Sequence, residues 1–313
     1  MNDILITAPL PDFLKQPLMA AYPCHDYLAA VDKAALLKDV GPKIKGLVQG
    51  GGTITPVELL EQLPKLEIIS VFGVGYDGVP VDYCKKRGIK AGHTPDVLTD
   101  DVSDVALALT LMLSRRFHLA NRFVHAGEWT KRNLPLSSSL TNKKAGIFGL
   151  GRIGKAIAKR LEACGMRIGY HGRNAQAVPY KYYPSLVEMA GDVDFLIIAA
   201  PGGATTKHVV NAEVLAALGS KGSVINIARG SLIDEPAMIA ALKNGTLGGA
   251  GLDVFANEPN VPAELLALDN VVLFPHVGSA TKETRKGMGD LVLANLEAYF
   301  AGKPLVKLIP ELQ

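Results

Sequence analysis

A run of glycines in the middle of the chain has the spacing of a phosphate-binding turn. Gly149-Leu150-Gly151-Arg152-Ile153-Gly154 follows an apolar, strand-like run and opens a helix-like one. In such a turn the first glycine permits the tight bend, the second lets the backbone approach a pyrophosphate, and the third lets helix and strand pack closely. The following helix supplies unpaired N–H groups and a positive dipole end. The run therefore predicts a dinucleotide site.

The segment after the next expected strand indicates which dinucleotide binds. An NAD site places a carboxylate about 20 residues past the glycine turn, where it binds the adenosine ribose hydroxyls. This chain has His171, Arg173 and Asn174 there and no carboxylate. A guanidinium fork suits a 2′-phosphate, and the other two side chains can add donors. We expect NADP(H), while a solvated arginine after a strand is the alternative interpretation of Arg173.

Three further segments place polar side chains just past the carboxyl ends of apolar runs. They contribute Arg229, then Asp253 with Glu258, and finally His276. In an open α/β sheet this edge faces the ligand crevice. A guanidinium can hold a carboxylate and polarise a carbonyl, and an imidazole, with an ordinary pKa of about 6.5, can exchange a proton. Glu258 is placed to orient the imidazole and favour its charged form. This set suits the reduction of a 2-oxo acid by hydride.

The same sheet edge supplies the other cofactor contacts that we expect. Asp253 lies near its strand end, where it is placed either to meet the nicotinamide carboxamide or to brace Arg229. The expected contacts beyond the glycine turn and the adenosine end are Pro201, Thr206, Ile227, Ala228, Asp253, His276 and Gly278. The other histidines, His25, His118, His125 and His208, lack partners at metal-ligand spacing, so no metal site is expected.

Two series of alternating strands and helices must position these residues. The first series covers residues 3–98, with strands expected at residues 4–7, 46–48, 68–72 and 89–91. The second has six expected strands, at residues 145–148, 167–170, 195–199, 223–228, 249–254 and 271–275. Such alternation predicts an α/β fold with parallel sheets covered by helices, and six such strands complete a doubly wound sheet.

The ends of the chain are expected to belong to one domain. Helical spacing at residues 281–300 stops at Gly302, and the first series is short for a domain, so we expect this terminal helix to complete it. The predicted substrate domain is therefore discontinuous, residues 1–98 with 288–313. The predicted dinucleotide-binding domain is residues 99–287, entered through one or two long helices at residues 100–129.

Composition and charge exclude several other classes. The length of 313 residues favours two domains, and 33 basic against 30 acidic residues leave a net charge of only +3. The densest basic runs, at residues 85–87 and 143–144, are too short for a nucleic-acid stripe. The longest apolar run, residues 105–113, is far short of the about 20 residues of a membrane span. We expect neither nucleic acid nor membrane as a partner.

The spacing of the cysteines and the first residues of the chain indicate the cellular compartment that we expect. Cys24, Cys84 and Cys164 are widely spaced and form no Cys-x-x-Cys pair, which favours reduced thiols. Asn2 and Asp3 lead directly into an apolar run, without the basic region and apolar core of a signal peptide. We therefore expect a cytoplasmic protein.

Four motifs in order resemble the D-isomer-specific 2-hydroxyacid dehydrogenase family. They are Gly-Leu-Gly-Arg-Ile-Gly at 149–154, Asn-Ile-Ala-Arg-Gly at 226–230, Gly-Leu-Asp-Val-Phe-Ala-Asn-Glu-Pro at 251–259 and Pro-His-Val-Gly-Ser-Ala-Thr at 275–281. The likeness covers residues 146–303, and more weakly 72–104. Within the family, residues 134–136, 171–173 and 234–236 are most similar to NADPH-dependent glyoxylate/hydroxypyruvate reductases and their hydroxyphenylpyruvate-reducing relatives.

The resemblance implies a role for each catalytic residue. Arg229 binds substrate, His276 is the general acid and base, and Glu258 is its partner. It further implies that the backbone amides of Val74 and Gly75 clamp the substrate carboxylate, although a plain tight turn explains glycine there equally well. The chain departs from many relatives at His93, where they have Asn, and in the loop at residues 201–206.

The resemblance also suggests a homodimer, formed through the helices at residues 100–129. The apolar stripe at residues 105–113 fits a dimer contact, and a helix buried within one domain would look the same. The activity that we expect is NADPH-dependent reduction of a small 2-oxo acid, glyoxylate to glycolate or hydroxypyruvate to D-glycerate. Larger 2-oxo acids, such as hydroxyphenylpyruvate or 2-ketogluconate, are the chemical alternative. A dinucleotide-sensing binding protein like the corepressors built on this fold is the alternative of another class.

Overall fold

The structure, a computed structural model that describes residues 2–313, contains two α/β units. The first unit runs to Leu98 and also takes in Thr281–Gln313, and the second is Thr99–Ala280. The sequence placed the return to the first unit at residue 288 instead. In the structure the chain returns to the first unit at Thr281. This residue caps the terminal helix, so the whole helix belongs to the first unit.

The first unit is built on a five-stranded parallel sheet in the order β2-β1-β3-β4-β5. The strands are β1 Asp3–Ile6, β2 Cys24–Asp26, β3 Ile44–Gly50, β4 Ile68–Phe72 and β5 Lys90–Gly92. The connecting helices are α1 Asp12–Ala21, α2 Lys33–Val40, α3 Val57–Glu61 and α4 Val81–Arg87. This is the flavodoxin-like strand order, and it reverses between β1 and β3.

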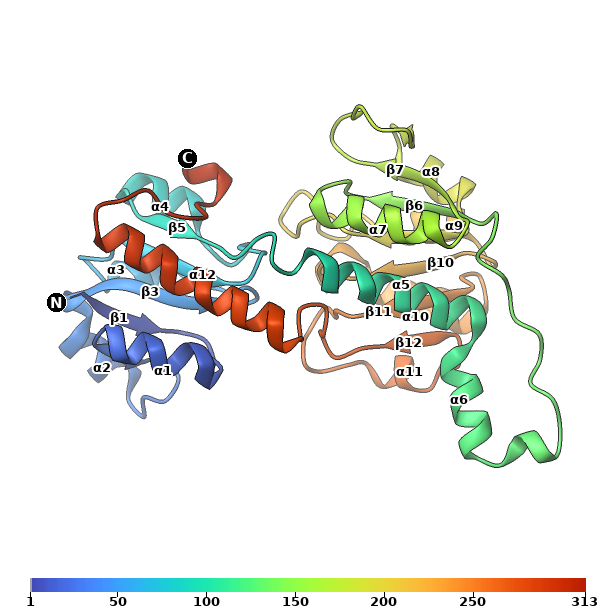
Figure 1. The fold of residues 1–313 in the computed structure, drawn as a ribbon, viewed down its shortest axis with the longest axis horizontal. Helices are drawn as coiled ribbons and strands as arrows, with labels where there is room; N and C mark the ends of the chain where they lie inside the picture. Colours follow the sequence, from blue (N-terminus) through green and yellow to red (C-terminus); the bar gives the residue numbers. More distant parts are fainter. Residues whose placement is uncertain (1) are drawn as a thin grey trace. The chain divides into compact units, whose positions relative to one another are not determined.

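The carboxyl-terminal helix α12, Lys282–Phe300, covers this first sheet next to α1 (Figure 1). The Thr281 hydroxyl caps it by accepting from the Thr284 N–H. After the helix, the chain runs along the free edge of β5, where His93 N–H donates to the Lys307 carbonyl and Ile309 N–H to the Ala91 carbonyl. The last residues thus cover a strand edge that would otherwise be open.

The second unit carries a seven-stranded parallel sheet in the order β12-β11-β10-β9-β6-β7-β8. Its strands are β6 Lys144–Phe148, β7 Arg167–His171, β8 Lys181–Tyr183, β9 Phe195–Ile198, β10 Ser223–Asn226, β11 Gly249–Leu252 and β12 Val271–Leu273. The central strands are buried and almost wholly apolar, as expected where helices cover both faces. The order reverses between β6 and β9, and in such a doubly wound sheet ligands bind beyond the strand ends at that point.

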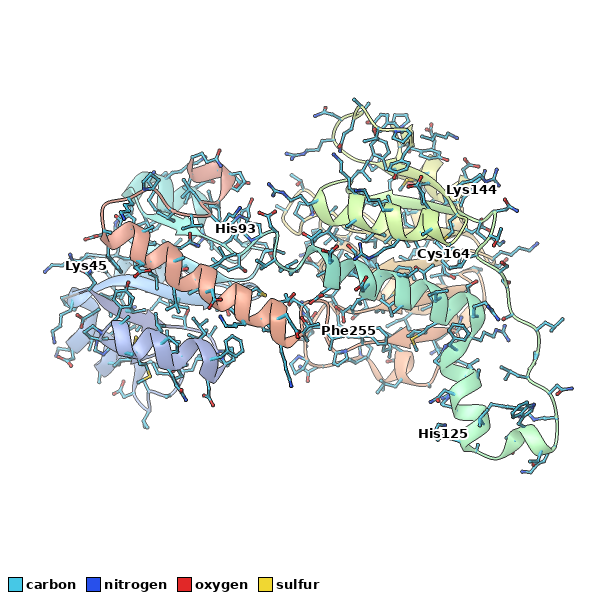
Figure 2. All side chains as sticks on the ribbon, in the orientation of Figure 1. Lys45, His93, His125, Lys144, Cys164 and Phe255 are labelled. Carbon is cyan, nitrogen blue, oxygen red and sulfur yellow. The ribbon has the colours of Figure 1, made fainter. Side chains whose placement is uncertain are left out.

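The helices of the second unit follow the same alternation, apart from one protruding arm. They are α5 Thr99–Arg115, α6 Phe117–His125, α7 Arg152–Ala163, α8 Leu186–Asp192, α9 Ala212–Leu218, α10 Glu235–Asn244 and α11 Ala263–Leu266. Helix α5 lies beside α7 and against β11, whereas α6 and the chain after it extend away from the sheet, with His125 at the end of α6 (Figures 1 and 2).

The predicted fold class, two parallel-sheet domains of Rossmann-like and flavodoxin-like type, is confirmed. The sequence missed two strands, β2 and β8. Both are three-residue strands at a sheet edge, and neither is fully buried. No run of three apolar residues marks either segment, whereas the equally short β12 is wholly apolar, and their strand character comes from pairing with β1 or β7.

Asn295 joins three segments of the first unit. Its side chain is 0% exposed, accepts a hydrogen bond from the Lys307 N–H at 2.9 Å and donates one to the His93 carbonyl at 3.4 Å. We expect Asn295→Leu to lower the free energy of unfolding by about 1–3 kcal/mol, because buried backbone groups lose their partner. Urea unfolding followed by circular dichroism measures this.

The matched control is Lys307→Ala, which keeps the backbone N–H and removes only an exposed side chain paired with Asp96. It should shift the unfolding midpoint little, because exposed ion pairs contribute at most about 1 kcal/mol. Equal losses in the two variants would show that the Asn295 side chain does not stabilise this junction.

Candidate active site

The glycine turn lies between β6 and α7, at the reversal point of the second sheet. Gly149 has a φ of 98°, which favours glycine, and a Cβ there would lie 2.6 Å from the Ala200 N. A Cβ at Gly154 would lie 2.2 Å from the Gly149 carbonyl oxygen. At Gly151, in contrast, nothing lies within 4 Å of the Cβ position, and no side chain caps the helix that follows. The turn thus leaves open backbone at a helix amino terminus, which fits a pyrophosphate.

The segment after β7 contains the residues expected at the adenosine end. Arg173 and Asn174 are exposed, and Arg173 forms no ion pair with any residue in the described part of the chain. His171 differs from expectation because its Nδ1 donates to the Tyr183 carbonyl at 2.9 Å, so only its other ring nitrogen remains for a ligand.

Gln176 is a residue of this region that the sequence analysis missed. Its side-chain amide donates to the Leu150 carbonyl at 3.0 Å, and its own N–H donates to the Tyr170 hydroxyl at 2.6 Å. These bonds tie the loop that carries Arg173 to the glycine turn. A lone glutamine in a loop gives no signal in the sequence for such a role.

Hydrogen bonds of Thr206 close the loop that follows β9, residues 201–206. The Thr206 hydroxyl donates to the Pro201 carbonyl at 2.9 Å, and its N–H donates to the Gly203 carbonyl at 3.1 Å. Thr206 therefore shapes the loop, and its hydroxyl keeps lone pairs for accepting from a ligand.

Arg229 follows β10 on a loop held by the buried Asn226. The Asn226 side chain accepts from the Ala228 N–H at 3.0 Å and donates to the Arg229 carbonyl at 2.8 Å. Ile227, the residue after Asn226, is buried. The Arg229 guanidinium also donates to the Ala228 carbonyl. Asn226 lies within one of the sequence motifs, but nothing in the sequence indicates this role. A buried amide with both ends occupied fixes the backbone from which Arg229 projects.

Asp253, at the end of β11, holds the loop that carries His276. The side chain is 1% exposed, and its two oxygens accept from the N–H groups of Val277 at 2.7 Å and Gly278 at 2.8 Å. Burial raises the pKa of Asp253, and the two amide donors offset only part of this effect. These contacts differ from the two that the sequence suggested, with nicotinamide or with Arg229.

His276 and Glu258 form the pair that could move a proton. The imidazole Nδ1 lies 2.6 Å from one Glu258 oxygen, and the other oxygen accepts from the Phe255 N–H at 3.0 Å. Since a carboxylate only accepts, Nδ1 carries the proton and donates, which leaves Nε2 for substrate. His276 has a φ of 53°, a conformation that costs a non-glycine residue about 1–3 kcal/mol and is found mostly at functional sites.

The charge of Glu258 is maintained by its neighbours. Burial by itself would raise its pKa, but the hydrogen bonds from His276 and Phe255, with the charges of His276 and Arg229, hold the pKa below its ordinary range. Glu258 is therefore a carboxylate throughout the pH range in which an imidazole exchanges protons. It can orient His276 and stabilise its charged form at the same time.

In the first unit, the predicted substrate clamp follows β4. The His93 Nδ1 donates to the Val74 carbonyl at 2.9 Å, and the Thr94 N–H donates to the Gly73 carbonyl at 2.9 Å. His93 lies just after β5 (Figure 2). Within residues 2–313 no acceptor is paired with the N–H of Val74 or Gly75. The two peptide groups are thus held through the carbonyl oxygens of Gly73 and Val74, and the N–H groups of Val74 and Gly75 remain available as donors.

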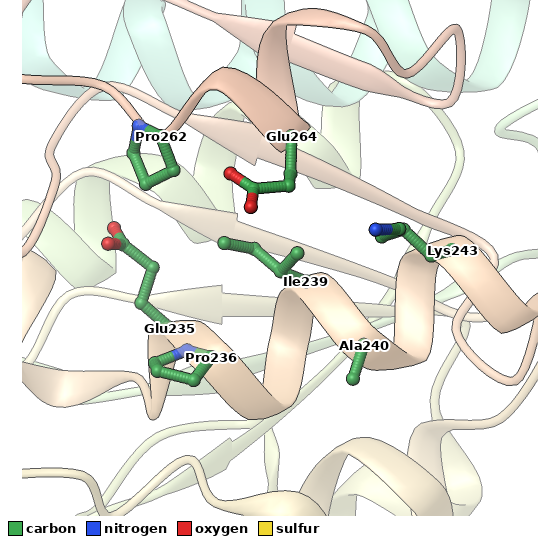
Figure 3. Close-up of a pocket in the computed structure, with 7 residues that line it drawn as sticks. All are labelled: Glu235, Pro236, Ile239, Ala240, Lys243, Pro262 and Glu264. Atoms are coloured by element: carbon green, nitrogen blue, oxygen red, sulfur yellow. The ribbon is translucent and has the colours of Figure 1, made fainter.

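Other features of the structure lie apart from these residues. A surface hollow of about 400 Å³ lies between α10 and the segment with Pro262 and Glu264, and none of the predicted site residues lines it (Figure 3). In the part of the chain that the structure describes, no group of three or more His, Cys, Asp or Glu side chains is arranged to hold a metal ion. No described helix has the length and apolar character needed to cross a membrane.

Comparison with known proteins agrees with this geometry. Residues 107–278 match the family model of the D-isomer specific 2-hydroxyacid dehydrogenase, NAD binding domain. The chain is 44% identical to a glyoxylate/hydroxypyruvate reductase A of Arabidopsis thaliana and to a hydroxyphenylpyruvate reductase of Plectranthus scutellarioides, each over 97% of both chains.

A solved structure adds the fold of the whole chain. The NADPH-dependent glyoxylate/hydroxypyruvate reductase of Sinorhizobium meliloti, in complex with NADP and malonate, superposes with a TM-score of 0.94 at 44% identity, covering 99% of this chain and 97% of that one. The resemblance seen in the four motifs is confirmed, and an enzyme rather than a sensing protein is indicated. The chain belongs to the D-isomer-specific 2-hydroxyacid dehydrogenases, which are NAD(P)-dependent oxidoreductases.

Proposed function

We propose that the chain reduces small 2-oxo acids with NADPH, giving glycolate from glyoxylate or D-glycerate from hydroxypyruvate. The observation that carries the proposal is the 2.6 Å contact between His276 and Glu258, on the strand-end edge that also presents Arg229 and the glycine turn. The relatives from Arabidopsis and Sinorhizobium are named for the same two substrates.

The polar groups have distinct tasks in the proposed reaction. The reduced nicotinamide supplies a hydride to the keto carbon. Glu258 holds the Nδ1–H of His276, so that Nε2 can deliver a proton to the developing alkoxide. Arg229 binds the substrate and polarises its carbonyl, and the free amides of Val74 and Gly75 bind the carboxylate.

Several features support NADPH as the cofactor. Gly149–Gly154, with Gly151 open to a ligand, would hold the pyrophosphate, and Arg173 with Asn174 and the free nitrogen of His171 would hold the 2′-phosphate. The nicotinamide half would lie along the strand ends at Pro201, Thr206, Ile227, Ala228, Asp253, His276 and Gly278. The absence of a carboxylate after β7 argues against NAD.

One observation is compatible with larger 2-oxo acids as substrates. Nothing lies within 4 Å of a Cβ placed at Gly52, in the loop after β3, so this loop leaves room beside the clamp-bearing strand. The Plectranthus relative is named for hydroxyphenylpyruvate. Steady-state turnover on glyoxylate, hydroxypyruvate, hydroxyphenylpyruvate and 2-ketogluconate separates the candidates by kcat/KM.

Removal of the Glu258 charge should slow the reaction. In Glu258→Gln the His276 imidazole loses its carboxylate partner, so at neutral pH kcat should fall by about 100-fold. The exposed Glu264 on α11 provides the control, because Glu264→Gln removes a charge from the same unit. An unchanged kcat in Glu258→Gln would remove Glu258 from the mechanism.

Arg173→Ala should weaken NADPH selectively. The loss of a charge-assisted contact to the 2′-phosphate predicts a KM for NADPH that is about 10- to 100-fold higher, with the KM for NADH within about twofold. Arg167→Ala, at the other end of β7, is the control and should alter neither value. A wild type that prefers NADH would contradict the assignment of Arg173.

We also infer a homodimer that buries α5 and the arm after it. Trp129 is 68% and Leu136 97% exposed, and α5 presents a partly exposed apolar face at Val105, Ala108 and Met112. Sedimentation velocity should give twice the chain mass of 33.2 kDa, and Trp129→Glu or Leu136→Glu should shift the chain toward monomer. Val306→Glu, an equally polar change on the first unit, should not. A monomeric wild type would contradict the inference.

A further inference from the structure

Arg285, in the first turn of α12, is a half-buried cation at the carboxyl end of β4. Its guanidinium lies over the ring of Phe72, with Cζ 5.6 Å from the ring centroid. Phe72 is the last residue of β4 and is only 7% exposed. The next three residues are Gly73, Val74 and Gly75. The positive charge is thus held beside the strand end from which the substrate clamp projects.

No acidic group compensates this charge within residues 2–313. Arg285 makes no hydrogen bond or ion pair with its side chain there, and burial alone lowers its pKa. Arg160 shows the usual arrangement, since its guanidinium contacts both Asp100 and Asp104. Burial of a cation with only an aromatic face as partner is unfavourable, because a cation–π contact returns about 0.5–2 kcal/mol.

A second observation at the same edge also indicates an anion. The loops after β3 and β4 are in close backbone contact: the Gly51 N–H donates to the Phe72 carbonyl, and a Cβ at Gly73 would lie 2.6 Å from the Gly51 Cα. This contact holds the start of the clamp, whose Val74 and Gly75 amides have no acceptor in the described chain. Directed N–H groups together with a cation lacking a counter-ion are the components of an anion site.

We propose that Arg285 supplies the positive charge of the substrate carboxylate site, with the Val74 and Gly75 amides as its directional donors, and so selects 2-oxo acids over neutral 2-oxo compounds. The inference rests on the proposed function, because the anion is the carboxylate of the substrate that is reduced. It divides the two electrostatic tasks: Arg285 binds the carboxylate, and Arg229 is left to polarise the keto oxygen.

The test compares a charged substrate with its neutral counterpart. The kcat/KM values for glyoxylate and for methyl glyoxylate are measured with NADPH for the wild type, Arg285→Met and Arg285→Lys. Arg285→Met should raise the KM for glyoxylate about 10- to 100-fold and change kcat/KM for the ester and the KM for NADPH less than about twofold. Arg285→Lys should recover part of the preference for the acid, because it keeps the charge.

Lys282→Met is the matched control, because it removes an exposed positive charge one turn earlier on the same helix. It should leave the ratio of the two kcat/KM values unchanged. NADPH binding, followed by cofactor fluorescence, shows that each variant is folded. If Arg285→Met does not fold, Arg285→Gln provides the same comparison with a polar side chain of similar length.

The outcomes separate this inference from the proposed function. A wild type that reduces no 2-oxo acid overturns both. A wild type that reduces glyoxylate, with an unchanged preference for acid over ester in Arg285→Met, overturns only the role of Arg285. Equal losses on acid and ester also overturn it, since a role in packing against Phe72 predicts that result. A loss confined to the acid supports the proposal.

Discussion

The buried carboxylate of Asp253 fixes the loop on which His276 lies, and the geometry of the His276–Glu258 pair depends on it. One side chain accepts two consecutive backbone amides, those of Val277 and Gly278. Such a two-point contact can hold His276 in its unfavourable positive-φ conformation, which would relax in a loop without these bonds. The Asp253 N–H in turn donates to the Asn226 carbonyl, and the Asn226 side chain holds the Arg229 loop. His276 and Arg229 are therefore positioned by one connected set of hydrogen bonds.

The parallel sheet explains why residues so far apart in sequence can share a site. All strands of the second unit run in one direction, so the segments after β6, β7, β10, β11 and β12 emerge at the same edge. The first unit repeats the arrangement with β3, β4 and β5. Net charge says little about such a protein. The informative feature is which cations lack an acidic partner. Within the described chain Arg173 and Arg285 lack one, whereas Arg160 forms ion pairs with both Asp100 and Asp104.

The sequence was sufficient for the elements that carry local signals. The glycine turn, the strand-end polar residues and the alternation of strands and helices were visible because each depends on a few adjacent residues. The edge strands β2 and β8 were missed because no apolar run marks them, in contrast to the equally short β12. Gln176 and the shared Asp253 contacts were also missed, since this amide and this carboxylate acquire their roles from partners up to 26 residues away. Asn226 was missed although its side chain binds the nearby backbone of Ala228 and Arg229. The lack of an ion pair at Arg285 was likewise not predictable, because only the structure shows that no carboxylate within residues 2–313 pairs with it.

The pKa values of the two carboxylates near His276 are shifted in opposite directions, which fits the different roles proposed for them. Burial dominates at Asp253, whose partners are neutral amides, and its pKa is raised. At Glu258 the imidazole, the Phe255 amide and the guanidinium of Arg229 outweigh burial, and its pKa is lowered. Glu258 therefore remains an acceptor in the pH range in which an imidazole exchanges protons, so in the proposed reaction the proton is supplied by the imidazole and not by its partner. Within residues 2–313 the hydrogen bonds of the Asp253 carboxylate go only to backbone amides, which fits a positioning residue. The two carboxylates thus lie in different environments.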